Sequence, residues 1–176
     1  MVIEVAANEK HRDAAREQAR SMGYTGSMMS GGRDAHASLA EIIAHELIGG
    51  EMVRSYDFDI AAPCGAKVDV KNKLLGRKPR GFYEVSIFEY TKKQACDYLL
   101  FTATPRDGSC VWICGGYGKQ DFMRDAELKR AGTLTGSNLL RLKRDNYIMC
   151  IDDLHAPCGA LEWLSGASHK KAPPIF

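Results

Sequence analysis

The sequence lacks an apolar run long enough to cross a lipid bilayer. Its longest apolar stretches, such as Tyr98–Thr104, fall far short of the roughly 20 residues that a transmembrane helix needs. The first residues, which include Glu4 and Glu9, also lack the basic start and apolar core of a secretory signal peptide. We therefore expect a cytoplasmic protein with no membrane partner.

A large excess of one charge is also missing. The 24 Lys and Arg residues are nearly balanced by 22 Asp and Glu residues, which gives a net charge of +2. A protein that merely coats nucleic acid carries a stronger basic excess, so any nucleic-acid site must be local. A basic run interrupted only by Asp69 is one candidate patch, and a solvated loop is the equally open alternative. The run consists of Lys67, Lys71, Lys73, Arg77, Lys78 and Arg80.

Tight C-x2-C pairs of cysteines are absent as well. The chain has six cysteines, and reduced thiols are the default without a secretory signal. A zinc site of Cys110, Cys114, Cys150 and Cys158 can be imagined, but it lacks the tight C-x2-C pairs typical of zinc sites. Cys110 and Cys114 flank an apolar segment, where cysteine packs as a small hydrophobe. We therefore favour a structural role for them.

The sequence does contain the composition of one globular domain. Its 176 residues are 45% hydrophobic and 26% charged, which suffices for a single core. We expect residues 1–35 to form an N-terminal helix and a Gly/Ser-rich loop packed on a core of residues 36–165. Residues 166–176 should form a loosely held tail.

Apolar periodicity predicts two helices followed by a strand-rich centre. Helices are expected over residues 5–22 and 36–48. Period-two alternation then predicts a hairpin of residues 56–60 and 67–73. This order indicates a mixed α+β (α/β) single domain. The remaining predicted elements are strands at 83–88, 98–104, 110–114 and 147–151, short turns or helices at 91–96 and 161–164, and a helix at 119–131.

The predicted hairpin gathers acidic side chains and a lysine. Side chains two positions apart on a strand share a face, so Asp69 and Lys71 point the same way, as do Asp57 and Asp59. Paired strands would place three carboxylates beside one lysine. Because like charges raise each other's pKa, such a cluster needs a compensating cation, and oxygen ligands favour Mg²⁺ or Mn²⁺.

This cluster has the groups that hydrolysis of a phosphodiester needs. A bound metal neutralises the phosphate and lowers the pKa of a coordinated water, and Lys71 is placed to hold or deprotonate that water and to stabilise charge on the phosphorane. An ordinary half-exposed hairpin with Asp opposite Lys is the alternative. A helical glutamate upstream, a second acid before D-x-K and buried strands after it favour the site.

These motifs resemble those of the PD-(D/E)XK nuclease superfamily, in particular its small phage-encoded members. The resemblance spans roughly residues 22–131. It implies a restriction-endonuclease-like core, with a central mixed sheet flanked by helices, within residues 36–165. It also implies a Mg²⁺- or Mn²⁺-dependent deoxyribonuclease that acts in phage DNA processing, recombination or host-DNA degradation, in the host cytoplasm. The segments that carry it are 37–41 (ASLAE), 56–59 (YDFD), 68–73 (VDVKNK), 83–87 (YEVSI), 94–98 (QACDY) and 115–122 (GGYGKQDF).

By position, the resemblance assigns metal ligands to both strands of the hairpin. Asp59, followed by Ile60, matches the opening aspartate, with Asp57 as the alternative. Asp69 matches the second acidic ligand and Lys71 the catalytic lysine. The carbonyl of Val70 matches the backbone ligand of such sites. One departure is that Phe58, and not proline, precedes Asp59.

Further residues are assigned around this pair of strands. Glu41 matches the helical glutamate that completes the cluster, with Glu46 as the alternative. Gln94 lies where related nucleases place a glutamine that contacts the lysine or DNA, but a capping box that begins at Thr91 is equally open. Lys119 is a further candidate phosphate contact. The DNA-binding residues expected from the basic run are Lys73, Arg77, Lys78 and Arg80.

Two other classes of function compete with the nuclease. One is a catalytically silent nucleic-acid-binding or host-interaction module on the same scaffold, and the other is a metal-free structural protein. The retained Asp59, Asp69, Lys71 and Glu41 favour the enzyme, because a silent protein has no need of a costly acidic cluster. Substrate shape, endo- or exonuclease action, DNA against RNA, and a homodimeric state stay open.

Overall fold

The computed structural model describes residues 1–21, 35–53, 55–135 and 140–167. The Gly/Ser-rich loop expected over residues 24–34 and most of the expected tail lie outside these residues. Within the described residues, no helix combines the length and the apolar character needed to cross a membrane.

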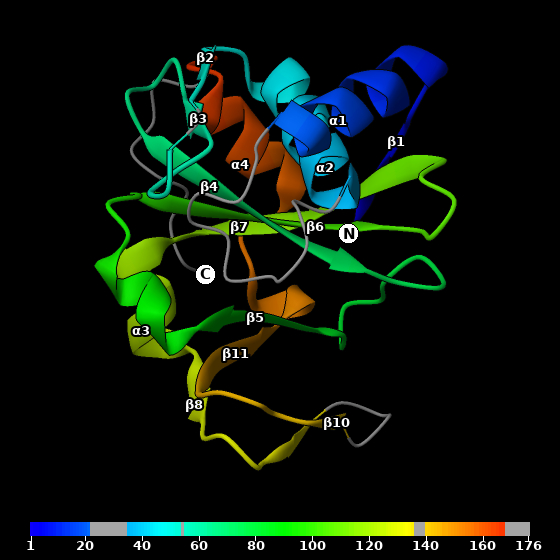
Figure 1. Ribbon diagram of the computed structural model, residues 1–176. Helices are drawn as coiled ribbons and strands as arrows, with labels where there is room; N and C mark the ends of the chain where they lie inside the picture. The colour runs from blue at the N-terminus through cyan, green and yellow to red at the C-terminus, as the bar shows by residue number, and fades with distance from the viewer. Residues whose placement is uncertain (22–34, 54, 136–139, 168–176) are drawn as a thin grey trace.

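A six-stranded mixed sheet forms the centre of the molecule (Figure 1). Its strands lie in the order β1-β7-β6-β4-β3-β2. Strands β4 and β6 run parallel, and the other neighbours are antiparallel. The predicted mixed α+β class with a central mixed sheet is confirmed. The strand bounds are Ile3–Ala6 (β1), Glu51–Met52 (β2), Ile60–Ala61 (β3), Lys67–Leu74 (β4), Tyr98–Thr104 (β6) and Cys110–Gly118 (β7).

Helices cover one face of this sheet (Figure 1). Helix α2 (Ala35–Ile48) packs on β4, and α1 (Glu9–Ser21) and α4 (Pro157–Leu164) pack on α2. Val68 and Val70 of β4 join the core under the helices. Since successive side chains of a strand alternate between faces, the neighbouring Asp69 and Lys71 point to the opposite side.

A smaller sheet lies on the other side of the central sheet (Figure 1). It has the order β5-β11-β8 and shares a second core with Leu99 and Phe101 of β6. The elements on this side are β5 (Glu84–Phe88), the 3-10 helix η1 (Glu89–Lys93), α3 (Lys119–Asp125), β8 (Glu127–Lys129), β11 (Asn146–Cys150) and the 3-10 helix η2 (Ile151–Asp153). A short ribbon pairs β9 (Leu134–Thr135) with β10 (Leu140–Arg141).

The first predicted helix starts too early. Residues 3–6 form β1, which pairs with β7 at the edge of the sheet. Asn8 then begins α1, because its side-chain oxygen accepts a hydrogen bond from the backbone N–H of His11 at 2.9 Å. This is an N-terminal cap. Residues 1–35 are therefore not only a helix and a loop, because they also supply a strand to the central sheet.

Two further sequence predictions are wrong in part. Of the expected strand 56–60, only Ile60 lies in a strand, because the Ser55 hydroxyl accepts hydrogen bonds from the backbone N–H groups of Asp57 and Phe58 in a turn. The helix expected over 119–131 ends at Asp125, and residues 127–129 pair with β11 instead. In the second case strand pairing overrides helix propensity.

Candidate active site

Strand β4 places Asp69 and Lys71 side by side, as their spacing predicts. Their parallel partners on β6 are Leu99 and Phe101, so both lie on the face opposite the helices. Asp69 is only 5% exposed. Its Oδ2 lies 2.5 Å from Nζ of Lys71. A buried carboxylate and a half-buried ammonium thus form a close ion pair in the middle of the sheet.

Asp59 approaches the same strand from its other edge. It is 7% exposed, and its Oδ2 accepts a hydrogen bond from the backbone N–H of Val70 at 2.8 Å. The backbone ladder between β3 and β4 covers Val68 and Lys67, so the Asp59 side chain continues it by one step. Because the N–H and C=O of one extended residue leave the strand on the same side, the Val70 carbonyl also faces this edge.

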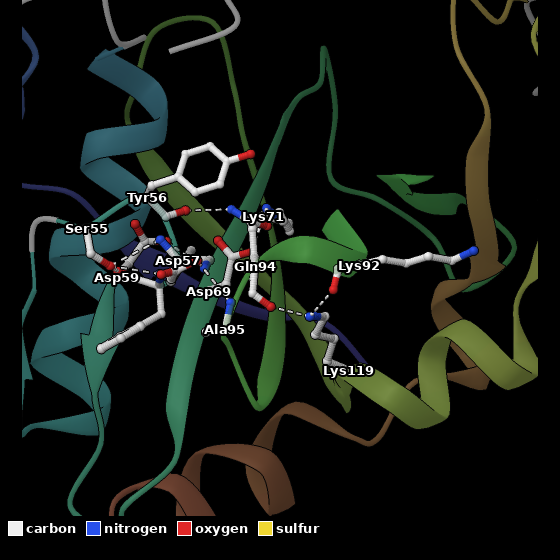
Figure 2. A network of polar contacts seen from close by, with 12 residues as sticks. Ser55, Tyr56, Asp57, Asp59, Asp69, Lys71, Lys92, Gln94, Ala95 and Lys119 are labelled. Atoms are coloured by element: carbon white, nitrogen blue, oxygen red, sulfur yellow. Dashed lines mark hydrogen bonds and ion pairs between the residues drawn. The ribbon is translucent and has the colours of Figure 1, made fainter. Parts of the chain in front are cut away.

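Gln94 connects Lys71 to the turn before β3 (Figure 2). Its Oε1 accepts a hydrogen bond from Nζ of Lys71 at 3.3 Å. Its Nε2 donates to the backbone carbonyl of Tyr56 at 2.7 Å. Gln94 follows the C-terminal end of η1, so the alternative of a capping box that starts at Thr91 is wrong.

Asp57 lies beside this connection rather than on a strand. Its Oδ1 accepts a hydrogen bond from the backbone N–H of Ala95 at 3.0 Å. The predicted shared strand face of Asp57 and Asp59 is wrong, because residues 56–59 form bends. The turn nevertheless brings both aspartates toward Asp69, and Figure 2 shows the three side chains around the same stretch of β4.

The Lys119 side chain is buried and contacts the backbone of the segment that carries Gln94. It is 8% exposed. Its Nζ donates hydrogen bonds to the backbone carbonyls of Lys92, at 3.1 Å, and of Gln94. The sequence suggested a phosphate contact at Lys119, whereas the buried ammonium fixes the backbone of the segment that carries Gln94. This role could not be predicted from the sequence, because the contacts join residues that are far apart along the chain.

The charges of the site keep Lys71 protonated. Burial works against the ammonium, but the negative charges of Asp69 and Asp59 outweigh it and raise the pKa of Lys71 above its ordinary value. Burial and the charge of Asp69 also raise the pKa of the nearby Cys96 thiol to about 11. The thiol is therefore neutral at physiological pH.

Carboxylate and carbonyl oxygens near β4 are the candidates for holding a divalent cation. Within the described part of the chain, no three His, Cys, Asp or Glu side chains lie close enough together to hold a metal ion. The set implied at this edge instead has two carboxylates, Asp59 and Asp69, with the Val70 carbonyl. Although Asp69 Oδ2 is close to Lys71, it is buried without a hydrogen bond of normal geometry. Mg²⁺ is usually bound by only a few protein ligands, and water molecules complete its coordination.

The two candidate helical glutamates both contact α1. Glu41 is 4% exposed, and its Oε2 accepts a hydrogen bond from Gln18 at 2.9 Å. Glu46 is exposed and pairs with Nε2 of His11 at 3.0 Å. These contacts stabilise the α1–α2 interface. A role for Glu41 at the metal stays a prediction from the resemblance.

The four basic residues expected to bind DNA follow Lys71 along the chain, and all are exposed. Lys73 ends β4 and donates a hydrogen bond to the backbone carbonyl of Glu84 at 3.2 Å. Lys78 lies 3.5 Å from a carboxylate oxygen of Glu4. Arg77 and Arg80 lie in the same loop between β4 and β5. The basic patch therefore begins at Lys73, two residues after Lys71 on the same strand.

Comparison with known proteins adds no relative to this picture. The sequence matches no model of a protein family, and a search of curated proteins gives no match. The interpretation of the site therefore depends on the residues and their geometry.

Proposed function

We propose that this protein is a divalent-metal-dependent nuclease that hydrolyses phosphodiester bonds in DNA. The observation that supports this proposal most is the position of Lys71, between Asp69 and Gln94 and beside the edge where Asp59 meets Val70. It is the arrangement that the resemblance to PD-(D/E)XK nucleases leads one to expect. We accordingly propose a restriction-endonuclease-like core for the six-stranded sheet and the helices on it.

The metal ligands proposed are Asp59, Asp69 and the carbonyl of Val70, with Asp57 and Glu41 as outer partners. Mg²⁺ or Mn²⁺ bound there would neutralise charge on the phosphate and lower the pKa of a coordinated water. Asp59 also accepts the Val70 N–H through Oδ2, which holds its carboxylate close to the Val70 backbone. Burial of both aspartates among apolar strands strengthens their attraction for a cation.

Lys71 is the proposed catalytic residue that does not bind metal. Since its ammonium is protonated, it can orient the attacking water and stabilise the negative charge that develops on the phosphorane. Gln94 restricts the ammonium from one side and Asp69 from the other. A group held in this way needs little reorganisation when charge develops.

The basic residues after β4 are the proposed DNA contacts. Lys73, Arg77, Lys78 and Arg80 are exposed, and contacts from Lys and Arg to phosphates position a nucleic acid without reading its sequence. The near-neutral total charge of +2 makes this local patch the part of the chain that would hold DNA over the site. The role proposed from the resemblance is phage DNA processing, recombination or host-DNA degradation.

The decisive experiment compares cleavage by matched variants. Plasmid, linear and branched DNA are incubated with the wild type, Asp69→Asn and Lys71→Met in Mg²⁺, Mn²⁺ or EDTA. Asp13→Asn and Lys93→Met, which change exposed residues, serve as controls. We expect cleavage by the wild type and controls in either metal, and a loss of at least about 100-fold in both site variants.

Two results would contradict the proposal in different ways. Cleavage that survives both Asp69→Asn and Lys71→Met would show that the site lies elsewhere. DNA binding without cleavage in any metal would favour the catalytically silent binding module.

A further inference from the structure

The turn before β3 carries an exposed aromatic side chain directly beside the proposed site. Tyr56 is 55% exposed, and its backbone carbonyl accepts the hydrogen bond from Gln94 that also connects to Lys71. One glutamine amide thus lies between the Tyr56 backbone and the proposed catalytic ammonium. Figure 2 shows the Tyr56 ring at the outer margin of the polar network.

The backbone under this ring is fixed on both sides. The Ser55 hydroxyl accepts hydrogen bonds from the N–H groups of Asp57 and Phe58 and donates one to the Phe58 carbonyl. The carboxylate of Asp57 accepts the Ala95 N–H at 3.0 Å. An aromatic side chain has only two rotatable bonds. Ordering the Tyr56 ring against a ligand therefore costs little conformational entropy.

Within the described part of the chain, the Tyr56 ring is exposed and has no ring packed on it. Phe82 packs edge-on against Tyr83 at 5.1 Å, and Phe88 stacks on Tyr90 at 5.3 Å. Among the described residues, no ring or cation packs against Tyr56. The Tyr56 ring offers a flat apolar face, its backbone is fixed, and it lies next to the lysine proposed to face a phosphate. Such a ring is suited to stack on a nucleobase.

We infer that Tyr56 stacks on an unpaired nucleobase of the substrate, next to the phosphate that Lys71 faces. This inference rests on the proposed function and narrows its substrate class. In the interior of an intact duplex both faces of each base are covered by neighbouring bases, and a terminal pair exposes one face. A single strand, a frayed end or a branch point offers unpaired bases with free faces. The substrate is therefore DNA with at least one unpaired nucleotide at the cut.

The test measures DNA binding without cleavage. Fluorescence anisotropy in EDTA, at one salt concentration, compares a labelled single strand, a blunt duplex of the same sequence and a duplex with a short unpaired flap. The variants are Tyr56→Ala and Tyr56→Phe, with Phe82→Ala as the matched exposed aromatic. Tyr56→Ala keeps the backbone carbonyl that Gln94 binds, so the polar network is retained.

We expect Tyr56→Ala to weaken binding of the single strand and the flap about tenfold, as loss of one base–aromatic stack implies. Binding of the blunt duplex, whose free base faces are those of its two terminal pairs, should change much less. Tyr56→Phe and Phe82→Ala should bind all three DNAs as the wild type does. Equal losses on all three DNAs, or no loss with Tyr56→Ala, would overturn the inference.

The two proposals can fail separately. Tyr56-dependent binding of unpaired DNA without cleavage in Mg²⁺ or Mn²⁺ would leave the stacking role intact and overturn the nuclease. Cleavage of blunt duplex that requires Lys71 but is unchanged in Tyr56→Ala would support the nuclease and overturn the stacking role.

Discussion

The carboxylate of Asp59 takes the place of a strand partner for Val70. Its Oδ2 accepts the Val70 N–H at 2.8 Å where the β3–β4 ladder ends. A buried backbone N–H must find an acceptor, so Asp59 has a structural task in addition to its proposed task as a metal ligand. The structural task needs only a hydrogen-bond acceptor, whereas the proposed metal-binding task needs a negative charge, so substitution can separate them.

Asp59→Asn and Asp59→Ala should therefore behave differently. The asparagine oxygen can still accept the Val70 N–H, so stability should be nearly retained while Mg²⁺ binding falls because the negative charge of the carboxylate is lost. The alanine variant leaves a buried donor without a partner and should lose about 1–3 kcal/mol as well. Urea unfolding and isothermal titration calorimetry measure the two effects. Equal stability of both variants would contradict this division.

Gln94→Ala should reduce cleavage while the protein stays folded. It removes the acceptor of Lys71 and the donor to Tyr56. Loss of such an outer partner typically costs roughly 10- to 100-fold in activity, and here the loss should fall on kcat because Lys71 becomes less well placed. Gln120→Ala, on the exposed side of α3, is the matched control. A wild-type kcat in Gln94→Ala would show that Lys71 needs no such support.

Lys119→Met should destabilise the protein. The backbone carbonyls of Lys92 and Gln94 lose their donor, which should cost about 1–3 kcal/mol. For a chain of this size, each kcal/mol lowers Tm by about 2–4 °C. Thermal unfolding compares Lys119→Met with Lys93→Met. Lys93 is an exposed lysine of η1, the segment that Lys119 contacts. Similar Tm values for the two variants would contradict a supporting role of Lys119.

His155 should make stability depend on pH below neutrality. Its ring stacks on Tyr117 at 4.6 Å, and its Nδ1 lies 3.2 Å from the Tyr98 hydroxyl. Burial lowers the pKa of His155 below its ordinary 6.5, against a smaller opposing effect of Asp121. The unfolded chain thus takes up a proton at higher pH than the folded chain does. Linkage then makes the free energy of unfolding fall as pH drops below about 6.5.

The check is a comparison with His155→Gln. Chemical unfolding between pH 7.5 and pH 5 should show a steeper decline for the wild type than for this variant. Parallel curves for the two proteins would mean that His155 does not contribute to the decline.

Local pattern was enough to predict the parts of the site that lie on one strand. The buried run Tyr98–Thr104 is β6 with the predicted bounds, and period two correctly placed Asp69 and Lys71 on one face. Both inferences need only the alternation of a strand and the length of an apolar run. The mixed α+β class followed from the order of such segments.

The remaining contacts depend on side chains far apart in the sequence. Gln94 meets Tyr56 and Lys71 only because η1 leads into a strand parallel to β4. Lys119 turns inward because β7 returns antiparallel to that strand. Local sequence patterns do not predict these side-chain contacts. The turn at Ser55 was missed for another reason, since a serine hydroxyl can replace strand pairing for the N–H groups that follow it.

The parallel pairing of β4 with β6 has a consequence for a chain still under synthesis. Asp69 and Lys71 leave the ribosome before Gln94 and the strand that covers them, and a parallel pair cannot close until its long connection is complete. The polar groups that contact one another in the folded protein are thus kept apart in the nascent chain. If the protein cuts DNA, its own translation delays the onset of that activity until residues 98–104 have docked.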